Sequence, residues 1–288
     1  MGRALIAGLT RDYEITAVYL GNYWVEDTAR VRYKKLDIRD KRGQSALFKD
    51  FRPEVVIHAA GVGSPDFAQA NKEFTRQVNV LGTQNIVSCC KKFQAKFIYI
   101  SSNAVYDGEK APYGESDPAK PINYYGRIKL EGEKITRDSG IIYAIVRPIM
   151  MYGWNYPFER INIATIALEK LKKHQPFFAY DDVFCNPLSV EFCARAILRM
   201  IQKSIYDVFN IGGKDTVSVY EFTRTLCEVF GLDSSLVKPV QQGFFKGLVK
   251  RPKDTSYNTA KMEKILGMPP LVLREGLELM REARKTYA

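Results

Sequence analysis

Three residues of this 288-residue chain have the types and spacing needed to move a proton. Tyr125 and Lys129 are four residues apart in the stretch 124–133, whose pattern predicts a helix, so both side chains lie on one face. A phenol with a pKa of about 10 gives up its proton reluctantly at neutral pH, and a neighbouring ammonium lowers that pKa. Ser102 follows the apolar run 97–100. A Tyr–Lys spacing of four is unspecific alone, but a hydroxyl at the carboxyl end of a predicted buried strand makes the trio a candidate site.

The elements that must position these residues alternate along the first two-thirds of the chain. Apolar runs separated by helical patterns predict strands at residues 14–20, 32–36, 55–59, 96–101, 142–147 and 206–211. This alternation predicts an α/β fold, a Rossmann-type doubly wound parallel sheet with helices on both faces.

Beyond residue 147 the pattern changes to mostly helical segments with longer loops. We therefore expect a dinucleotide-binding Rossmann domain over residues 1–150, to which residues 186–214 return. Residues 151–185 and 215–288 are expected to form a smaller, mostly helical substrate lobe over the carboxyl ends of the strands, where such sheets bind ligands.

The start of the sequence departs from the usual order of such folds. A strand and a Gly-rich turn normally precede the first helix, whereas residues 1–5 here lead directly into a helical pattern. The missing strand would be central, so its loss would leave two interior strand edges unpaired. We expect the natural chain to carry about 10 to 12 further residues upstream, a strand and the turn.

Composition narrows the class of ligand. The net charge is +11, but Lys and Arg are spread along the chain without a dense tract, which favours phosphorylated small molecules over nucleic acid as ligands. Two distant histidines and five cysteines without paired spacing predict no metal site, and the thiols are expected to be reduced and buried. No run approaches the roughly 20 apolar residues of a membrane span, and no secretion signal begins the chain. We expect a cytoplasmic protein with no membrane association.

Several blocks of the sequence resemble the extended short-chain dehydrogenase/reductase family. These blocks are 56–61, 79–85, 101–106, 125–129, 146–148 and 152–153. Within the family, a second set of blocks is most similar to the dTDP-4-dehydrorhamnose reductase (RmlD-like) branch: 107–108, 112–115, 121–126 and 251–252. The order and spacing agree over most of the chain.

The resemblance implies an NAD(P)-dependent reductase of a nucleotide-activated keto sugar, in dTDP-rhamnose biosynthesis or a related pathway. In that reaction Tyr125 would be the general acid, Lys129 would lower its pKa and hold the nicotinamide ribose, and Ser102 would hydrogen-bond the substrate oxygen. The implied cofactor-binding residues, besides Tyr125 and Lys129, are Gly2, Asp37, Ile38, Ala59, Ala60, Gly61, Asn79, Pro148 and Ile149. The implied substrate-binding residues are Ser102, Asn103, Asn155 and Arg251.

Some of these assignments have structural alternatives. Asn79 is equally compatible with a buried polar residue of a helix, and Asp37 with a surface turn. No acidic residue stands at 20–22, where one would hold the ribose of NAD, so NADP is the expected cofactor, with NAD as the alternative. His58 is expected to be packed and hydrogen-bonded rather than catalytic.

Two other functions stay open. An NAD-dependent sugar-nucleotide 4-epimerase of the same family would suit residues 102–106 equally, whereas a 4,6-dehydratase is disfavoured because Asn103 and Ala104 replace its Asp-Glu pair. The reductase branch itself usually has Asp at the position of Asn103. The second alternative is a non-catalytic subunit like the regulatory subunit of methionine adenosyltransferase, which resembles the same branch. Homodimers are common in the family, which leaves a homodimer open.

Overall fold

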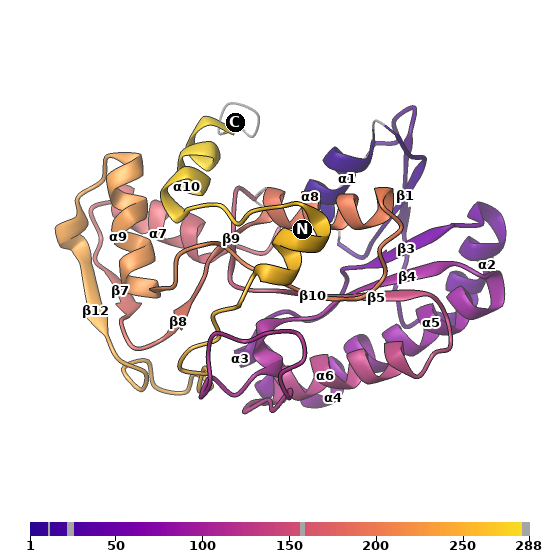
Figure 1. Ribbon diagram of the computed structural model, residues 1–288, viewed down its shortest axis with the longest axis horizontal. Coiled ribbons are helices and arrows are strands. Elements are labelled where there is room, and N and C mark those ends of the chain that lie inside the picture. The colour runs from indigo at the N-terminus through magenta and orange to yellow at the C-terminus, as the bar shows by residue number, and fades with distance from the viewer. Residues whose placement is uncertain (11, 22–25, 156–158, 284–288) are drawn as a thin grey trace. The chain divides into compact units, whose positions relative to one another are not determined.

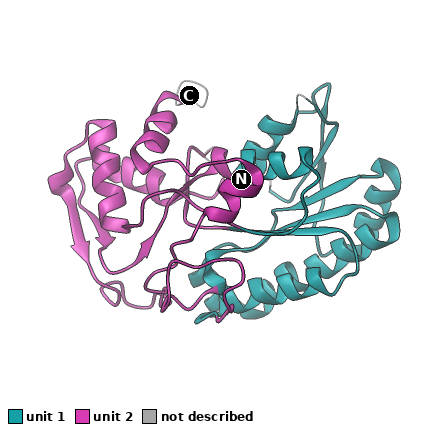
Figure 2. Cartoon of the chain, viewed as in Figure 1, with its two compact units in different colours: residues 1–105, 121–147, 194–209 teal, residues 106–120, 148–193, 210–288 magenta. Residues whose placement is uncertain are grey.

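The computed structural model describes residues 1–10, 12–21, 26–155 and 159–283, and its contacts divide the chain into two compact units (Figure 2). The first unit consists of Met1–Val105, Pro121–Arg147 and Ala194–Phe209. The second consists of Tyr106–Lys120, Pro148–Cys193 and Asn210–Ala288. Residues 106–120 thus group with the second unit by contact, although the sequence prediction left them in the first. Which ligand each part binds stays a prediction.

The predicted parallel sheet is present in two parts. Strand β1 (Ile15–Tyr19) pairs in parallel with β2 (Val31–Lys35). The second part has the order β10-β5-β4-β3. Its strands are β3 (Val55–His58), β4 (Lys96–Ile100), β5 (Tyr143–Pro148) and β10 (Val208–Ile211). Strand β4 is parallel to both β3 and β5. All six strands predicted from the sequence are confirmed.

Two strands keep an open edge where the sheet is interrupted. Within the described residues, β1 pairs only with β2, and β3 pairs only with β4. Val18 of β1 is 42% exposed, and Leu20 directly after β1 is 55% exposed. These two edges are the ones that the sequence predicted to lack a partner.

Helices cover both faces of the sheet in the first unit (Figure 1). Those on one face are α2 (Lys41–Phe51), α3 (Pro65–Ala70), α4 (Lys72–Arg76), α5 (Gly82–Phe93) and α6 (Tyr124–Arg137), with a π-helical turn at Gln77–Leu81. Those on the other face are α1 (Gly2–Leu9) and α8 (Val190–Gln202). The side chains of α2 and α5 form a buried apolar cluster with β4 and β5, which includes Phe48, Ile86, Phe97 and Ile145. The doubly wound arrangement is confirmed.

The second unit is less helical than its sequence predicted. Its helices are α7 (Ile163–Lys172), α9 (Val219–Phe230) and α10 (Leu273–Glu282), with 3-10 or π turns at Ser234–Leu236 and Met262–Leu266. Its short strands are β6 (Met151–Tyr152), β7 (Phe177–Tyr180), β8 (Phe184–Cys185), β9 (Leu188–Ser189), β11 (Val217–Ser218) and β12 (Val237–Val240). They pair as β11-β8, β12-β7 and β6-β9. These strands were missed because two to four residues are too few to show an alternating pattern.

The helices begin where the sequence supplies a capping side chain. Asn123 caps α6 by accepting a hydrogen bond from the amide of Gly126. Ser218 and Glu221 form a capping box at the start of α9, and Gly231 ends that helix with φ of 65°. Among the residues that the structure describes, no helix has both the length and the apolar composition needed to cross a membrane.

Candidate active site

Helix α6 brings Tyr125 and Lys129 to the carboxyl end of β4. Gly126 permits this approach, because a Cβ at that position would lie 2.0 Å from the carbonyl oxygen of Ala104. Tyr125 packs against Ala104 in a small apolar cluster that also holds Ala68. The helix therefore contacts the turn that begins one residue after Ser102, and the predicted Tyr–Lys face is directed into the protein.

The ammonium of Lys129 is buried among aromatic rings. Its Nζ donates a hydrogen bond of 2.9 Å to the carbonyl oxygen of Ile100, the last residue of β4. The same nitrogen lies 5.3 Å from the ring centroid of Tyr99 and 6.0 Å from that of Tyr125. Burial lowers the pKa of Lys129 to about 8, and the charge of Glu133 partly opposes that shift. Lys129 is thus a cation next to the phenol of Tyr125.

Ser102 stands two residues beyond the carbonyl that Lys129 contacts. Its hydroxyl donates to Oδ1 of Asn103 at 3.2 Å and accepts a hydrogen bond from the amide of Ala104 at 3.2 Å. Ser102, Tyr125 and Lys129 are all buried, each with 8% of its surface exposed. The structure brings together the three residues predicted to carry the chemistry.

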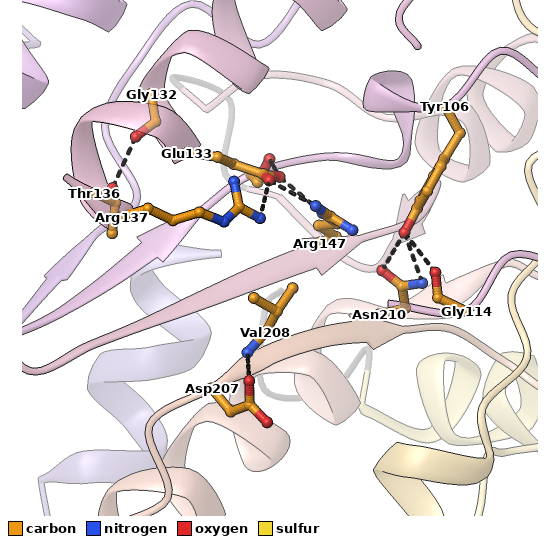
Figure 3. Close-up of polar contacts among 11 residues, drawn as sticks. Tyr106, Gly114, Gly132, Glu133, Thr136, Arg137, Arg147, Asp207, Val208 and Asn210 are labelled. Atoms are coloured by element: carbon orange, nitrogen blue, oxygen red, sulfur yellow. Dashed lines mark hydrogen bonds and ion pairs between the residues drawn. The ribbon is translucent and has the colours of Figure 1, made fainter. Parts of the chain in front are cut away.

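A buried carboxylate, that of Glu133, lies one helical turn beyond Lys129 on α6 and was not assigned a role from the sequence. Figure 3 shows it between the guanidinium groups of Arg137 and Arg147. Glu133 is fully buried and accepts hydrogen bonds from Ser101, Arg137 and two nitrogens of Arg147. Burial alone would raise the pKa of Glu133, but the hydrogen bonds and charge of Arg147 outweigh it and hold the pKa below its usual value. The signal available in the sequence was a charged residue, Arg147, within an otherwise apolar strand.

The loop after β3 is exposed, and Asn79 anchors it. Ala59, Ala60 and Gly61 are all exposed at the carboxyl end of the strand. The side-chain amide of Asn79 accepts from the amide of Val62 at 2.7 Å and donates to its carbonyl oxygen at 2.9 Å. A Cβ at Gly61 would lie 2.9 Å from Oδ1 of Asn79, so the loop approaches this side chain closely. Asn79 therefore shapes the loop through backbone contacts.

Asp37 and Ile38, two of the predicted cofactor-binding residues, form hydrogen bonds with neighbouring residues. The carboxylate of Asp37 forms an ion pair of 2.6 Å with Arg39, and the hydrogen bonds from Arg39 lower the pKa of Asp37. The carbonyl oxygen of Ile38 accepts from Gln44 and Asn85, and its side chain packs on Gly82. The backbone of Asp37 and Ile38 is thus fixed at the end of β2.

The other predicted residues lie apart from this cluster in the chain. Gly2 is the exposed first residue of α1. Pro148 ends β5, and the amide of Ile149 donates to the carbonyl oxygen of Ile211 at 3.2 Å. Asn155 and Arg251 belong to the second unit, where the guanidinium of Arg251 donates to the carbonyl oxygen of Val249.

The stretch 20–22, used to predict the cofactor, is described only in part. Asn22, part of the stretch that favoured NADP, lies outside the described residues.

The histidine and the cysteines have the structural roles expected of them. His58 is buried, its Nε2 lies 3.0 Å from the hydroxyl of Thr83, and burial followed by the charge of Lys129 lowers its pKa to about 3. It is therefore neutral at physiological pH. All five cysteines are free and buried.

Comparisons with known proteins place the chain in a family. A family model for the RmlD substrate binding domain matches residues 1–285. The chain belongs to the RmlD substrate-binding domain family. Among curated relatives of this RmlD family member, methionine adenosyltransferase 2 subunit beta from Xenopus tropicalis is 29% identical over 247 residues, covering 82% of this chain and 72% of the relative.

Solved structures agree with the RmlD assignment. A hypothetical dTDP-4-dehydrorhamnose reductase from Sulfolobus tokodaii is 27% identical, with a TM-score of 0.83. The superposition covers 96% of this chain and 94% of the chain of that structure. A dTDP-4-dehydrorhamnose reductase from Bacillus anthracis, solved in complex with NADP, has a TM-score of 0.84 at 22% identity, with 94% and 99% coverage. The second likeness shows the Rossmann-like fold alone.

Proposed function

We propose that this chain is an NAD(P)-dependent reductase of a nucleotide-activated keto sugar, with a 4-keto-6-deoxy sugar nucleotide as the favoured substrate. The observation that carries the proposal is the position of the Lys129 ammonium, buried beside the Tyr125 phenol and bonded to the strand end that leads to Ser102. Membership of the RmlD family and the likeness to the reductase from Sulfolobus tokodaii support the reaction class.

In the proposed reaction Tyr125 supplies the proton. A carbonyl oxygen gains negative charge as the carbon is reduced, and a phenol within hydrogen-bond reach transfers its proton to that oxygen. The positive charge of Lys129 stabilises the phenolate left behind, because the two groups share a site with little water. The hydroxyl of Ser102, which donates to Asn103 without substrate, turns its proton to the same carbonyl oxygen and fixes its direction.

The residues present fit a nicotinamide cofactor. An ammonium has three donors, and within the described residues the only acceptor for Lys129 is the carbonyl of Ile100, so two donors remain for the hydroxyls of a ribose. The exposed loop of small residues at Ala59, Ala60 and Gly61 leaves room for a ligand at the end of β3. When bound, the cofactor supplies the hydride. Asp37 and Ile38 would border its adenine, and Pro148 and Ile149 its nicotinamide.

NADP is the proposed cofactor, in line with the relative from Bacillus anthracis that was solved with NADP. The test is a titration of the protein with NADPH and, separately, with NADH, followed by nicotinamide fluorescence. We expect micromolar binding of NADPH and weaker binding of NADH. A folded sample that binds neither would contradict the proposal, and tighter binding of NADH would overturn the choice of cofactor.

The substrate is tested by the absorbance of NADPH in the presence of a panel of sugar nucleotides. We expect oxidation of NADPH with a dTDP-linked 4-keto-6-deoxy sugar. A UDP- or dTDP-linked hexose without a keto group serves as the control, because it has no carbonyl to reduce. In a parallel assay with NAD+ in place of NADPH, exchange of configuration at C4 of that hexose without net reduction of NAD+ would instead identify an epimerase, because the hydride removed from C4 is returned to it.

A second candidate function is that of a regulatory subunit, which the 29% identity to methionine adenosyltransferase 2 subunit beta favours. The two functions make different predictions for Tyr125. A regulatory subunit would modify the activity of a methionine adenosyltransferase equally well as wild type and as Tyr125→Phe, and would not turn over keto sugar nucleotides. Turnover that Tyr125→Phe abolishes would identify the reductase.

A further inference from the structure

The carboxylate of Glu133 joins three elements at the carboxyl edge of the sheet (Figure 3). It belongs to α6, one turn beyond Lys129. Its Oε1 accepts from the hydroxyl of Ser101, directly after β4, at 2.5 Å and from Nε of Arg147, near the end of β5, at 2.8 Å. Its Oε2 accepts from the other end of the same guanidinium at 2.7 Å. Arg147 is 2% exposed, so this bidentate pair lies inside the protein.

We propose that Glu133 is a positioning residue that fixes Ser102 and Lys129 relative to each other, with Arg147 as its partner. The inference rests on the proposed function for its effect on catalysis. Ser101 precedes Ser102, and its amide donates to the carbonyl oxygen of Val146 at 2.7 Å, so the strand end is held by the sheet on one side and by Glu133 on the other.

The link to Lys129 runs through both the helix and the strand. Lys129 lies four residues before Glu133 on α6, and its Nζ donates to Ile100, the residue before Ser101. The two hydrogen bonds, Lys129 to Ile100 and Ser101 to Glu133, therefore tie adjacent residues of the strand end to adjacent turns of one helix. Loss of the second bond leaves, among the hydrogen bonds of the described residues that join these two segments, the one donated by the ammonium that the reaction uses.

Glu133 also acts on Lys129 through its negative charge. The negative charge of Glu133 favours the protonated form of Lys129 and opposes the effect of burial on its pKa. The other titratable groups around the ammonium are the phenols of Tyr99 on β4 and Tyr125 on α6, and the neutral imidazole of His58 on β3. Glu133 is thus the anion that acts on Lys129.

The first test measures Lys129 without any cofactor. NMR titration of isotope-labelled lysine side chains, with Lys129 assigned from a Lys129→Arg variant, gives its protonation midpoint. We expect Glu133→Gln to shift this midpoint to lower pH. Glu131→Gln is the matched control, because Glu131 lies on the same helix but pairs with Arg76 at the surface, and it should leave the midpoint unchanged. An unchanged midpoint in folded Glu133→Gln would overturn the proposal.

A single substitution at Glu133 leaves Arg147 buried without its anion, which strongly destabilises a protein. If Glu133→Gln does not fold, the double variant Glu133→Gln with Arg147→Gln removes both charges and keeps hydrogen-bonding groups in place. Loss of the Arg147 cation partly offsets loss of the Glu133 anion that acts on Lys129, so a smaller downward shift of the Lys129 midpoint is expected in that variant. A midpoint at or above that of the wild type would overturn the proposal.

The second test separates positioning from general stability. Ser101→Ala removes one hydrogen bond to Glu133 and leaves the ion pair intact. Ser139→Ala is its matched control, since Ser139 is another buried serine, bonded to the carbonyl oxygen of Thr136 at the far end of α6. We expect Ser101→Ala to lower kcat by roughly tenfold with KM within about twofold of wild type, because a small misplacement of reacting groups acts on the chemical step. Equal kcat values for the two variants would overturn the proposal.

The two tests also separate this proposal from the proposed function. A wild-type protein that neither binds NADPH nor turns over keto sugar nucleotides would contradict the reductase, while the NMR titration would still decide whether Glu133 acts on Lys129.

Discussion

Burial of the Lys129 ammonium lowers the stability of the folded protein. The buried ammonium has a pKa of about 8 in the folded protein, against 10.5 for an ordinary lysine. Below about pH 8 both the folded and the unfolded chain carry this proton, so the cost of burying the charge is present in full. Between these two values the folded chain releases the proton first, and the cost disappears as pH rises.

Replacement of Lys129 by methionine should therefore stabilise the protein while removing its function. We expect Lys129→Met to raise the free energy of unfolding at pH 7 by up to about 3 kcal/mol, and by less at pH 10. Chemical denaturation at the two pH values measures the difference. Lys134→Met, an exposed lysine of the same helix, should change stability little at either pH. Lower stability of Lys129→Met at pH 7 would show that the ammonium is well solvated.

Sequence patterns predicted the side chains that react, but not the buried residues that hold them in place. Tyr125 and Lys129 share a local spacing, and Ser102 follows a recognisable strand, so short-range sequence was enough to find them. Glu133 and Arg147 were not assigned because their roles depend on a contact between residues 14 positions apart on different elements. An apolar strand that contains an arginine was the only indication that a buried partner exists.

The open edges of β1 and β3 define a local pattern of amide protection. In a parallel pair successive amides point alternately to the two sides of a strand. The amide of Ile15 donates to Arg30, so those of Thr16 and Val18 point away from β2. We expect the amides of Thr16 and Val18 to exchange with solvent much faster than those of Ala17 and Tyr19.

The same alternation applies to β3. Lys96 donates to the carbonyl oxygen of Glu54, which turns the amides of Val56 and His58 towards β4 and those of Val55 and Ile57 away from it. Hydrogen exchange followed by NMR measures both strands. Uniform protection along β1 and β3 would show that another segment pairs with these edges in solution.

The contact between α6 and the turn after Ser102 requires a glycine. A Cβ at Gly126 would lie 2.0 Å from a backbone oxygen, so Gly126→Ala must displace the helix. We expect a loss of about 1–3 kcal/mol in the free energy of unfolding and a weakened NADPH complex. In contrast, Gly8→Ala in α1 meets only Leu198 at 3.9 Å and should stabilise the protein by up to about 1 kcal/mol. Thermal unfolding of the two variants compares them, and equal stability would contradict this account of α6.

Elements with strong periodicity were predictable, and the shortest ones were not. The six longer strands of the sheet and helix α6 follow from apolar runs and helical spacing. The two-residue strands of the second unit depend on which segments meet in space, so no local sequence pattern predicts them. β12 even contains Pro239, which sequence rules associate with interrupted strands.

The charge of the whole molecule should guide a phosphorylated ligand to its site. With a net charge of +11, the protein attracts anionic dinucleotides over a distance that salt shortens. We expect the association rate constant for NADPH to fall several-fold between about 10 mM and about 300 mM NaCl, with a smaller change in the dissociation rate. Stopped-flow fluorescence measures both rates, and an association rate independent of salt would contradict the expectation.

The proposed reduction depends on Tyr125 as the proton donor. The most direct test compares wild type with Tyr125→Phe in the oxidation of NADPH by a dTDP-linked 4-keto-6-deoxy sugar. The phenylalanine keeps the ring that packs on Ala104, so the fold and NADPH binding should persist. We expect kcat to fall roughly 10²–10⁴-fold, because the phenylalanine cannot donate a proton. Turnover that survives this substitution would contradict this role of Tyr125.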